Sequence, residues 1–553
     1  MRSSRFSLLL ALSLAVGMFV GAISTGGAQG NYAIPYGDDV PGAYFPWIPN
    51  GSELDGMGPF YGTLTVQNLS SEPADIYLFP GHGSPENAWG IPTALGNMPP
   101  NASATVTAGA LDIPAPGGSV RAHAIPVDYS YDFERGGFFN DEDESLSPDD
   151  YGRVAGAVKN VSSAPGTNAN TSAANITLDG YGGLTTDHLT SKPTGAYRYV
   201  VPIVQANDGW NTVLRIANFG PERLSSASSV YNISVYEAGG PGATQDPVGQ
   251  YIGDVRSGEV ESVDLIADIG LEPGFVGNAF LTSNQPLGIV AERYKLGNQM
   301  LLTNVARGEA MDTDTHIAPL VFRNYNNWNS GISVTNLSEI EDTTVTVTYI
   351  SNEGEAATSD EISIARRGMA YVYHPGTGDG AGTTFVGAAI IQSSNGAPIQ
   401  AVVDQVKYFG DADDVGDAMS YVTDPQVAGN QAPAAGNRLS LPLMQRGTPD
   451  GLGDNSGVQL FNPVAGSSVQ ISVQIFDQSG AEVVLDGPIA QTLAGRQSLI
   501  VYAPDIDELP QRFQGSLVVT VTGGDGLLTA VSNNVNYAVQ ADGGSVFSMP
   551  VID

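Results

Sequence analysis

The stretch that decides the fold runs from Ala318-Pro319-Leu320 through Ile332-Ser333-Val334-Thr335-Asn336 to Val345-Thr346-Val347-Thr348-Tyr349. Apolar and polar residues alternate in the last two segments, and a period of two is typical of half-buried β-strands. Turn-forming Gly and Asn separate such segments. Thr, Val, Ser and Gly dominate, and no stretch has an amphipathic helical pattern. The chain is therefore predicted to be all-β.

The same pattern recurs four times along the chain. Each copy begins with an apolar strand led by Pro, and a short alternating strand that ends in Asn follows it. Three copies later contain Phe-x-Gly at the start of another apolar strand, whereas the first copy has Pro116-Gly117-Gly118. Recurrence of these anchors in register indicates an internal repeat. The prolines are Pro46, Pro202, Pro319 and Pro442.

Short strands at regular spacing, bounded by Gly, Pro and Asn turns, favour a sandwich of about seven strands per copy. We therefore predict four tandem Ig-like β-sandwich domains in an elongated array. The first domain carries an acidic and aromatic insertion at 127–150 and a flexible linker at 162–175. The predicted domains are 44–195, 198–312, 315–428 and 438–553.

The N-terminal segment has the pattern of an export signal. Arg2 and Arg5 precede an apolar run from Phe6 to Val20, and small residues lead to Gly30. This order is typical of a secretory signal peptide, predicted here at 1–30. A retained membrane anchor is the alternative, but the run is short for a span of about 20 residues. We therefore expect an extracellular or cell-surface location, with no membrane span after signal cleavage.

The composition of the chain limits which partners and sites are expected. The formal net charge of −36 argues against nucleic acid and anionic lipid. The chain has no cysteine, which excludes a thiol nucleophile, a thiolate metal site and a lipoprotein anchor. An apolar fraction of 42% is enough for real hydrophobic cores.

The repeated Asn is predicted to be a structural turn amide. In every copy it has the same parity as the apolar residues of its strand, so alternation points it toward the core. A buried amide needs hydrogen-bond partners, and the adjacent turn offers backbone groups. A ligand site repeated four times is the alternative. The four residues are Asn68, Asn218, Asn336 and Asn462.

The insertion is the predicted contact site. Its carboxylates could hold a hard cation, and calcium is the one cofactor that the sequence suggests. A solvated acidic loop is the alternative, because the order of acids does not match an EF-hand. The aromatic residues could meet a partner. The metal candidates are Asp141, Asp143, Asp149 and Asp150, and the contact candidates are Tyr129, Tyr131, Phe133, Phe138 and Phe139.

Signatures of an enzyme are poor. The five His have no metal-ligand spacing, and no Gly-x-Ser-x-Gly elbow or phosphate-binding Gly loop occurs. We therefore predict that the protein is not an enzyme. Trp210 and Trp328 each lie eight residues before their repeated Asn, where they could pack against the sandwich or stack on a sugar.

At Pro319 to Asn336 the chain reads Pro-x-x-x-x-x-Tyr-Asn-x-Trp-x-Ser-Gly-Ile-x-Val-x-Asn, with Phe385-Val-Gly, Pro398-Ile and Ala418-Met-Ser-Tyr421 later. This pattern resembles a family of uncharacterised secreted bacterial tandem β-sandwich repeat proteins. In composition the chain is also similar to S-layer and other surface-lattice proteins. The resemblance implies an extracellular sandwich array and no catalytic residue.

The expected function is that of a non-catalytic, structural or adhesive cell-surface protein whose sandwiches act as spacers. The alternative is a secreted carbohydrate-binding protein that uses exposed aromatic loops. The expected partners are other surface proteins or cell-envelope polysaccharide, with self-association as a further prediction.

Overall fold

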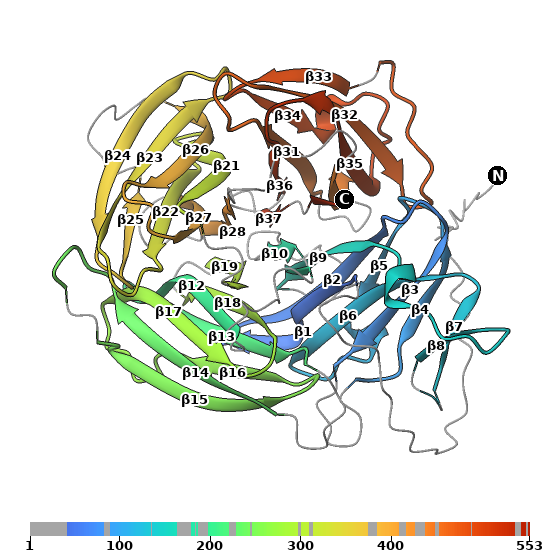
Figure 1. Ribbon diagram of the computed structural model, residues 1–553, viewed down its shortest axis with the longest axis horizontal. Helices are drawn as coiled ribbons and strands as arrows, with labels where there is room; N and C mark the ends of the chain where they lie inside the picture. Colours follow the sequence, from blue (N-terminus) through green and yellow to red (C-terminus); the bar gives the residue numbers. More distant parts are fainter. Residues whose placement is uncertain are drawn as a thin grey trace, which may run out of the picture.

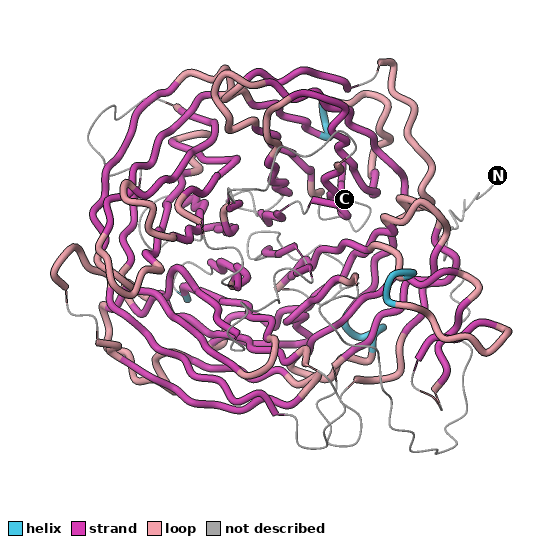
Figure 2. The backbone as a smooth tube through the Cα atoms, in the orientation of Figure 1, coloured by secondary structure: helices cyan, strands magenta, loops and turns pink. Residues whose placement is uncertain are grey.

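The computed structural model describes residues 41–81, 89–133, 135, 137–162, 178–182, 184–185, 197–220, 228–243, 246–296, 300–308, 313–373, 384–408, 416–425, 437–447, 453–487, 489–536, 544–548 and 551–552. The predicted signal peptide and nearly all of the predicted linker lie outside these residues. Antiparallel strands make up almost all regular structure, with only short 3-10 segments in the described chain (Figure 2). The prediction of an all-β protein is confirmed.

The strands form four successive units, each with two antiparallel sheets (Figure 1). We call the sheet with the unit's first strand its first sheet, and the sheet with the second strand its second sheet. In unit 1 the orders are β4-β3-β6-β1-β11 and β5-β2-β9-β10, and pairing of β1 with β2 joins them. Its strands are β1 (Ala43–Leu54), β2 (Met57–Asn68), β3 (Ala74–Pro80), β4 (Thr93–Met98), β5 (Ser103–Thr107), β6 (Gly117–Pro126), β9 (Val154–Val161), β10 (Leu178–Gly182) and β11 (Leu184–Thr185), with the separate hairpin β7 (Tyr129–Asp132) and β8 (Gly137–Asn140).

Units 2 and 3 have matching topology. The first sheets are β15-β14-β17-β12-β20 and β24-β23-β26-β21-β29, and the second sheets are β16-β13-β18-β19 and β25-β22-β27-β28. The strands of unit 2 are β12 (Tyr197–Ala206), β13 (Trp210–Asn218), β14 (Ser228–Glu237), β15 (Gly249–Arg256), β16 (Val260–Asp264), β17 (Phe275–Ser283), β18 (Leu287–Lys295), β19 (Met300–Val305) and β20 (Arg307–Gly308). Those of unit 3 are β21 (Thr315–Arg323), β22 (Asn329–Asn336), β23 (Thr343–Ser351), β24 (Ala356–Ile364), β25 (Met369–Tyr373), β26 (Phe385–Ser393), β27 (Ile399–Tyr408), β28 (Gly416–Val422) and β29 (Asp424–Pro425).

Unit 4 repeats the plan as β33-β32-β35-β30-β38 and β34-β31-β36-β37, joined where β30 meets β31. Its strands are β30 (Arg438–Arg446), β31 (Asn455–Phe461), β32 (Ser468–Asp477), β33 (Ile489–Ala494), β34 (Ser498–Tyr502), β35 (Phe513–Gly524), β36 (Thr529–Val535), β37 (Gly544–Ser548) and β38 (Val551–Ile552). The 3-10 segments are η1 (Ala108–Leu111), η2 (Pro148–Asp150) and η6 (Ala503–Asp505).

The repeated Pro and Gly have backbone roles. The register of the first strand shifts next to the Pro in every unit, as between Val201 and Val204 in β12, because Pro cannot donate a ladder hydrogen bond. The Gly of Phe-x-Gly lies against a backbone carbonyl of the neighbouring strand in its sheet. A Cβ at Gly277 would lie 2.0 Å from the Tyr236 oxygen, so no larger residue fits. Gly387 and Gly515 have the same surroundings.

Each unit has its own core, and the strands that pack on neighbouring units or line the centre of the ring are buried on their second face as well. Outer strands such as β15 instead keep every second residue exposed. Leu214, Ile216 and Ile289 pack inside unit 2. All nine residues of β13 and all seven of β28 are buried, which requires packing on both faces of the sheet. The first sheet of each unit packs on the second sheet of the next unit, as when β12 contacts β22 and β27.

The units form a closed ring, so the predicted elongated array is wrong. Strand β30 of unit 4 contacts β2 and β9 of unit 1, which closes the circle (Figure 1). The physical reason is that the sheet faces turned toward the neighbouring units are also buried, and a linear array would leave two such faces in water. At the centre, β10, β19, β28 and β37 contact one another in sequence around the ring.

Candidate functional site

The repeated Asn makes the same Oδ1 contact in all four units. Its side chain is fully buried, and its Oδ1 accepts a hydrogen bond from the backbone two residues later, as from Ser338 N at 3.0 Å to Asn336. The Nδ2 atom of Asn336 donates to Glu341 O of its own turn at 2.8 Å. The Nδ2 atoms of Asn68, Asn218 and Asn462 donate to carbonyls on strands β4, β15 and β33, namely Met98 O, Val255 O and Leu493 O.

The hairpin β7–β8 buries part of the aromatic set that was predicted to face a partner. Tyr131 and Phe138 are buried and pack on Phe79 with ring centroids 5.4 and 6.3 Å away. The prediction of contact is therefore wrong for these two residues, because they form the apolar underside of the hairpin. Tyr129, Phe133 and Phe139 are half-buried, and Arg135 lies 3.6 Å above the Phe139 ring.

The predicted calcium ligands do not come together. Within the described residues no group of three or more His, Asp or Glu side chains is placed to hold a metal ion. Asp141, Asp143, Asp149 and Asp150 are all exposed, and Asp143 instead lies 3.2 Å from Arg135. These carboxylates are exposed to solvent and do not converge on one point, so the metal prediction is not carried further.

Trp and His side chains in the described part are structural. Trp210 and Trp328 are buried and do not offer a ring to a ligand. His123 is buried among Tyr44, Phe79 and Tyr151. Burial, with Arg121 nearby, lowers the pKa of His123 to about 4. Burial and Arg307 lower the pKa of His316 to about 3.

The side chains at the junctions between units are the best candidates for a specific role, which is to select the neighbouring unit. At each junction the residue just before the repeated Asn faces the neighbouring unit. There it meets one or both of two positions on the neighbouring unit, the residue after the repeated Gly and the residue two positions before the repeated Pro. Ala217 lies in a cluster with Tyr44, Thr335 bonds Asn278, Phe461 packs on Ile317 and Ala388, and Gln67 bonds Ser440 and Ser516.

Three junctions use different chemistry at this shared position. Phe461 of unit 4 packs on Ile317, Ile350 and Ala388 of unit 3. Thr335 of unit 3 donates to Pro202 O of unit 2 at 2.9 Å and accepts from Asn278 at 3.4 Å. Ala217 of unit 2 belongs to the aromatic cluster with Tyr44 of unit 1.

The closing junction between units 4 and 1 is polar at the same position. Gln67 donates from Nε2 to Ser516 Oγ at 2.8 Å and accepts from Ser440 Oγ. All three side chains are buried. Gln67 therefore satisfies both ends of its amide across the junction, a match that only two hydroxyl groups at these places supply.

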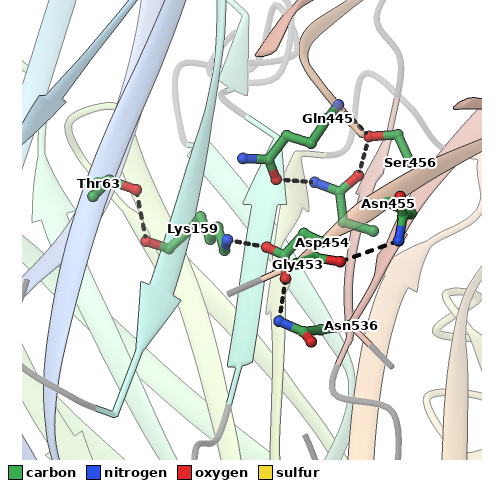
Figure 3. Close-up of polar contacts among 9 residues, drawn as sticks. Thr63, Lys159, Gln445, Gly453, Asp454, Asn455, Ser456 and Asn536 are labelled. Atoms are coloured by element: carbon green, nitrogen blue, oxygen red, sulfur yellow. Dashed lines mark hydrogen bonds and ion pairs between the residues drawn. The ribbon is translucent and has the colours of Figure 1, made fainter. Parts of the chain in front are cut away.

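A buried ion pair also crosses this junction (Figure 3). Lys159 of β9 donates from Nζ to Asp454, which directly precedes β31. Asp454 also accepts from Asn536 Nδ2 at 2.6 Å. The side chains of Lys159 and Asp454 are only 5% and 2% exposed. The pair therefore crosses from unit 1 to unit 4 inside the protein.

Charged groups also cross or line two other junctions. Arg293 of unit 2 donates from Nη1 to Asp404 of unit 3 at 2.7 Å. Glu292 accepts from Arg215 Nε at 2.6 Å and from Trp47 Nε1 of unit 1 at 3.1 Å. Arg307 lies 3.5 Å from Asp424 of unit 3, and burial raises the pKa of that carboxyl to about 6 although Arg307 opposes the rise.

The repeated turn after the third strand docks on the next unit. Gly239 N of unit 2 donates to Met369 O of unit 3 at 3.2 Å. Ser498 N of unit 4 donates to Asn352 O of unit 3, and Ser103 N of unit 1 donates to Gln478 O of unit 4. A Cβ at Gly480 would lie 2.6 Å from Pro100 O of unit 1, which explains the glycine there.

Sequence reasoning missed the junction residues. Gln67, Ala217, Thr335 and Phe461 have the opposite parity to the repeated Asn, so alternation assigned them to the solvent side. A signal was present, because none of the four is charged in a strongly acidic chain. The arrangement holds neighbouring sheets in a fixed order.

Comparison with known proteins gives little. No family model matches the chain, and no curated protein matches it. Among solved structures, the chain is weakly similar to CfaE, the adhesive subunit of the CFA/I fimbria of enterotoxigenic Escherichia coli. The TM-score is 0.11 and the sequence identity is 8%, over 42% of this chain and 87% of that chain. A likeness of this size identifies neither a fold nor a function.

Proposed function

We propose that the protein is a non-catalytic, extracellular structural or adhesive protein of the cell surface. The observation that carries the proposal is the closed ring, in which each unit packs on both of its neighbours and buried ionic groups lie between units. Such a ring is a rigid platform. Its contacts with a partner then come from exposed loops. Export through residues 1–30, an Ig-like architecture of the units and a composition similar to that of surface-lattice proteins are parts of the same proposal.

The hairpin region is the contact surface that we assign to this platform. Its underside is fixed by Tyr131 and Phe138 within the aromatic cluster of unit 1. Its rim carries an exposed run of four acids, Asp141, Glu142, Asp143 and Glu144, and Val127 is 52% exposed. A fixed base with a charged rim favours a partner that offers cationic groups, such as another surface protein.

A charge-neutral variant of the rim tests this function. The variant D141N/E142Q/D143N/E144Q should fold normally, because all four side chains are exposed, and should bind isolated cell envelopes several-fold more weakly. The matched control is E482Q/D486N/D505N/D507N, which removes four exposed charges from unit 4. Equal binding by both variants, or no envelope binding by the native protein, would refute the assignment. Cell fractionation supplies the location.

Carbohydrate binding is the second candidate, and one observation favours it. The aromatic side chains with at least a third of their surface exposed in the described chain, Tyr325, Tyr371 and Tyr408, all belong to unit 3. Aromatic faces stack on sugar rings. Replacement of all three by Ser should abolish retention on insoluble polysaccharide, whereas the four-acid rim variant should not. Absence of retention of the native protein would eliminate this candidate.

A further inference from the structure

We propose that the faces of units 1 and 4 that meet at the closing junction are a docking pair that also joins two copies of this chain, by exchange. The partner is thus a second copy, and the contact is the one between Gln67 on one side and Ser440 and Ser516 on the other. The inference goes beyond the proposed function, because it needs no cell surface or foreign partner.

The closing junction joins the first and last units of the ring. Elsewhere, the first sheet of one unit meets the second sheet of the unit that follows it in sequence. Here the first sheet of unit 4 meets the second sheet of unit 1, and β30 contacts β2 and β9. This interface is heterologous: the two faces differ and complement each other. The face of unit 4 on one copy therefore fits the face of unit 1 on another copy with the same contacts.

The chemistry of the two faces makes the docking selective. Gln67 needs an acceptor and a donor, which Ser516 and Ser440 provide. At the same positions unit 3 offers Ala388 and Ile317, which cannot satisfy an amide. An unpaired buried amide costs about 1–3 kcal/mol, so the face of unit 1 rejects the face of unit 3.

Other contacts at this junction, charged and uncharged, also favour pairing of the face of unit 1 with the face of unit 4. Lys159 is buried, and its ion pair needs Asp454 of unit 4. Elsewhere at this junction, Arg438 Nη2 of unit 4 donates to Leu69 O at 3.0 Å and Gln514 Nε2 donates to Thr105 Oγ1 at 2.9 Å. A wrong partner would leave a buried ammonium without its carboxylate, which is strongly unfavourable.

Concentration decides between a closed ring and exchange. Within one copy the two faces are held near each other, so the effective concentration is of millimolar order or higher and closure within the copy is favoured. When many copies fold together at high concentration, the face of unit 1 on one copy competes for the face of unit 4 on another. The product is a dimer or a longer chain of copies with native junctions.

Two single-cysteine variants test this directly, since the native chain has no cysteine. Gln67→Cys and Ser440→Cys proteins are mixed in equal amounts, unfolded together in urea, refolded at low and high protein concentration, and oxidised. The pair across the junction then becomes a disulfide only if the two residues come from different copies. We expect a disulfide-linked heterodimer whose yield rises several-fold with protein concentration.

The controls make every outcome decisive. Ile317→Cys occupies the position of Ser440 at another junction, and its mixture with Gln67→Cys should give no more heterodimer than folded proteins mixed without unfolding. If the Ser440→Cys mixture gives no more than this background, the proposal is overturned. Light scattering of the refolded native chain covers the case in which a variant does not fold. Purely monomeric native protein at the highest concentration would equally overturn it.

Discussion

The junction between units 3 and 4 and the junction between units 4 and 1 solve the same packing problem in opposite ways. Both place one side chain, Phe461 or Gln67, at the same position of the second sheet. Phe461 meets Ile317 and Ala388 in an apolar contact, and Gln67 meets two hydroxyl groups. Apolar contact gives more stabilisation per area, and a satisfied polar contact gives more discrimination between partners.

The difference explains how four similar units keep one order. Units with identical junction chemistry could pair out of sequence, because their backbones match. The chain gives each junction a different set: aromatic with Ala217, hydrogen-bonded at Thr335, apolar at Phe461 and amide-hydroxyl at Gln67. Mismatched pairs then leave either a cavity or an unpaired polar group, which penalises the wrong order.

Replacing Phe461 with Gln gives the largest expected effect, because it imposes the closing chemistry on the apolar junction. Loss of the aromatic ring should lower the free energy of unfolding by about 3–5 kcal/mol. The buried amide would find Ile317 and Ala388, and leaving it unpaired adds about 1–3 kcal/mol. Urea denaturation followed by tryptophan fluorescence measures the change. The triple variant F461Q/I317S/A388S should recover the part of the loss that is due to the unpaired amide, because two hydroxyl groups can then bond it. If stability does not recover, the amide and the two hydroxyl groups are not a matched set.

Breaking the buried ion pair is the next largest effect. Asp454→Ala leaves Lys159 buried without this carboxylate and should cost about 3–5 kcal/mol. The variant K159M/D454L replaces both partners with apolar groups of similar size and should lie within about 1–2 kcal/mol of the native protein. The same denaturation assay compares the two. If the double variant is as unstable as Asp454→Ala, the pair does more than satisfy its own charges.

The repeat anchors could be predicted from sequence because their causes are local. Pro202 blocks a ladder bond within its own strand, and Asn336 bonds the turn that follows it. The ring could not be predicted, because its closure depends on contacts between residues such as Gln67 and Ser440, far apart in the chain. Alternation shows one buried face of a strand, but it does not reveal that an uncharged second face is buried too.

The hairpin shows the same limit at the level of a site. Alternating aromatics and acids predicted an insertion at 127–150, and strands β7 and β8 lie within this range. The sequence did not reveal which aromatics point inward, because Tyr131 and Phe138 find their partners on β3. Clustering of acids along the chain likewise did not place them around one point in space.

Removing the amide from the closing junction has a smaller effect than breaking the ion pair. Gln67→Leu keeps the volume but leaves the hydroxyl of Ser440 without this partner, whereas Ser516 still donates to Asn101 O at 3.0 Å, so we expect a loss of about 1–3 kcal/mol. The double variant Q67L/S440A should restore most of this loss, since it removes the unpaired hydroxyl and leaves the bond from Ser516 to Asn101 in place. A double variant less stable than Q67L would show that the amide stabilises the junction by more than its bond to Ser440.

The smallest effect, taken per pH unit, concerns pH and compares the junction of units 2 and 3 with the core of unit 1. His123 has a pKa of about 4 when folded and 6.5 when unfolded, so the unfolded state binds more protons between these values. The free energy of unfolding therefore falls as pH drops from 6.5 toward 4, by at most about 1.4 kcal/mol per pH unit. His316 contributes the same sign of dependence, from 6.5 down to about 3.

Asp424 opposes His316 within the same junction. Its pKa is raised from 3.8 to about 6, so between these values the folded state binds more protons and stability rises as pH falls. The two contributions nearly cancel between about pH 5 and 6, which leaves His123 as the uncompensated group. His123→Gln should therefore flatten the decline of stability over this range, whereas H316Q/D424N should keep it. Urea denaturation at a series of pH values measures both slopes. If the free energy of unfolding still falls steeply with pH in His123→Gln, or no longer falls in the double variant, other groups cause the acid sensitivity.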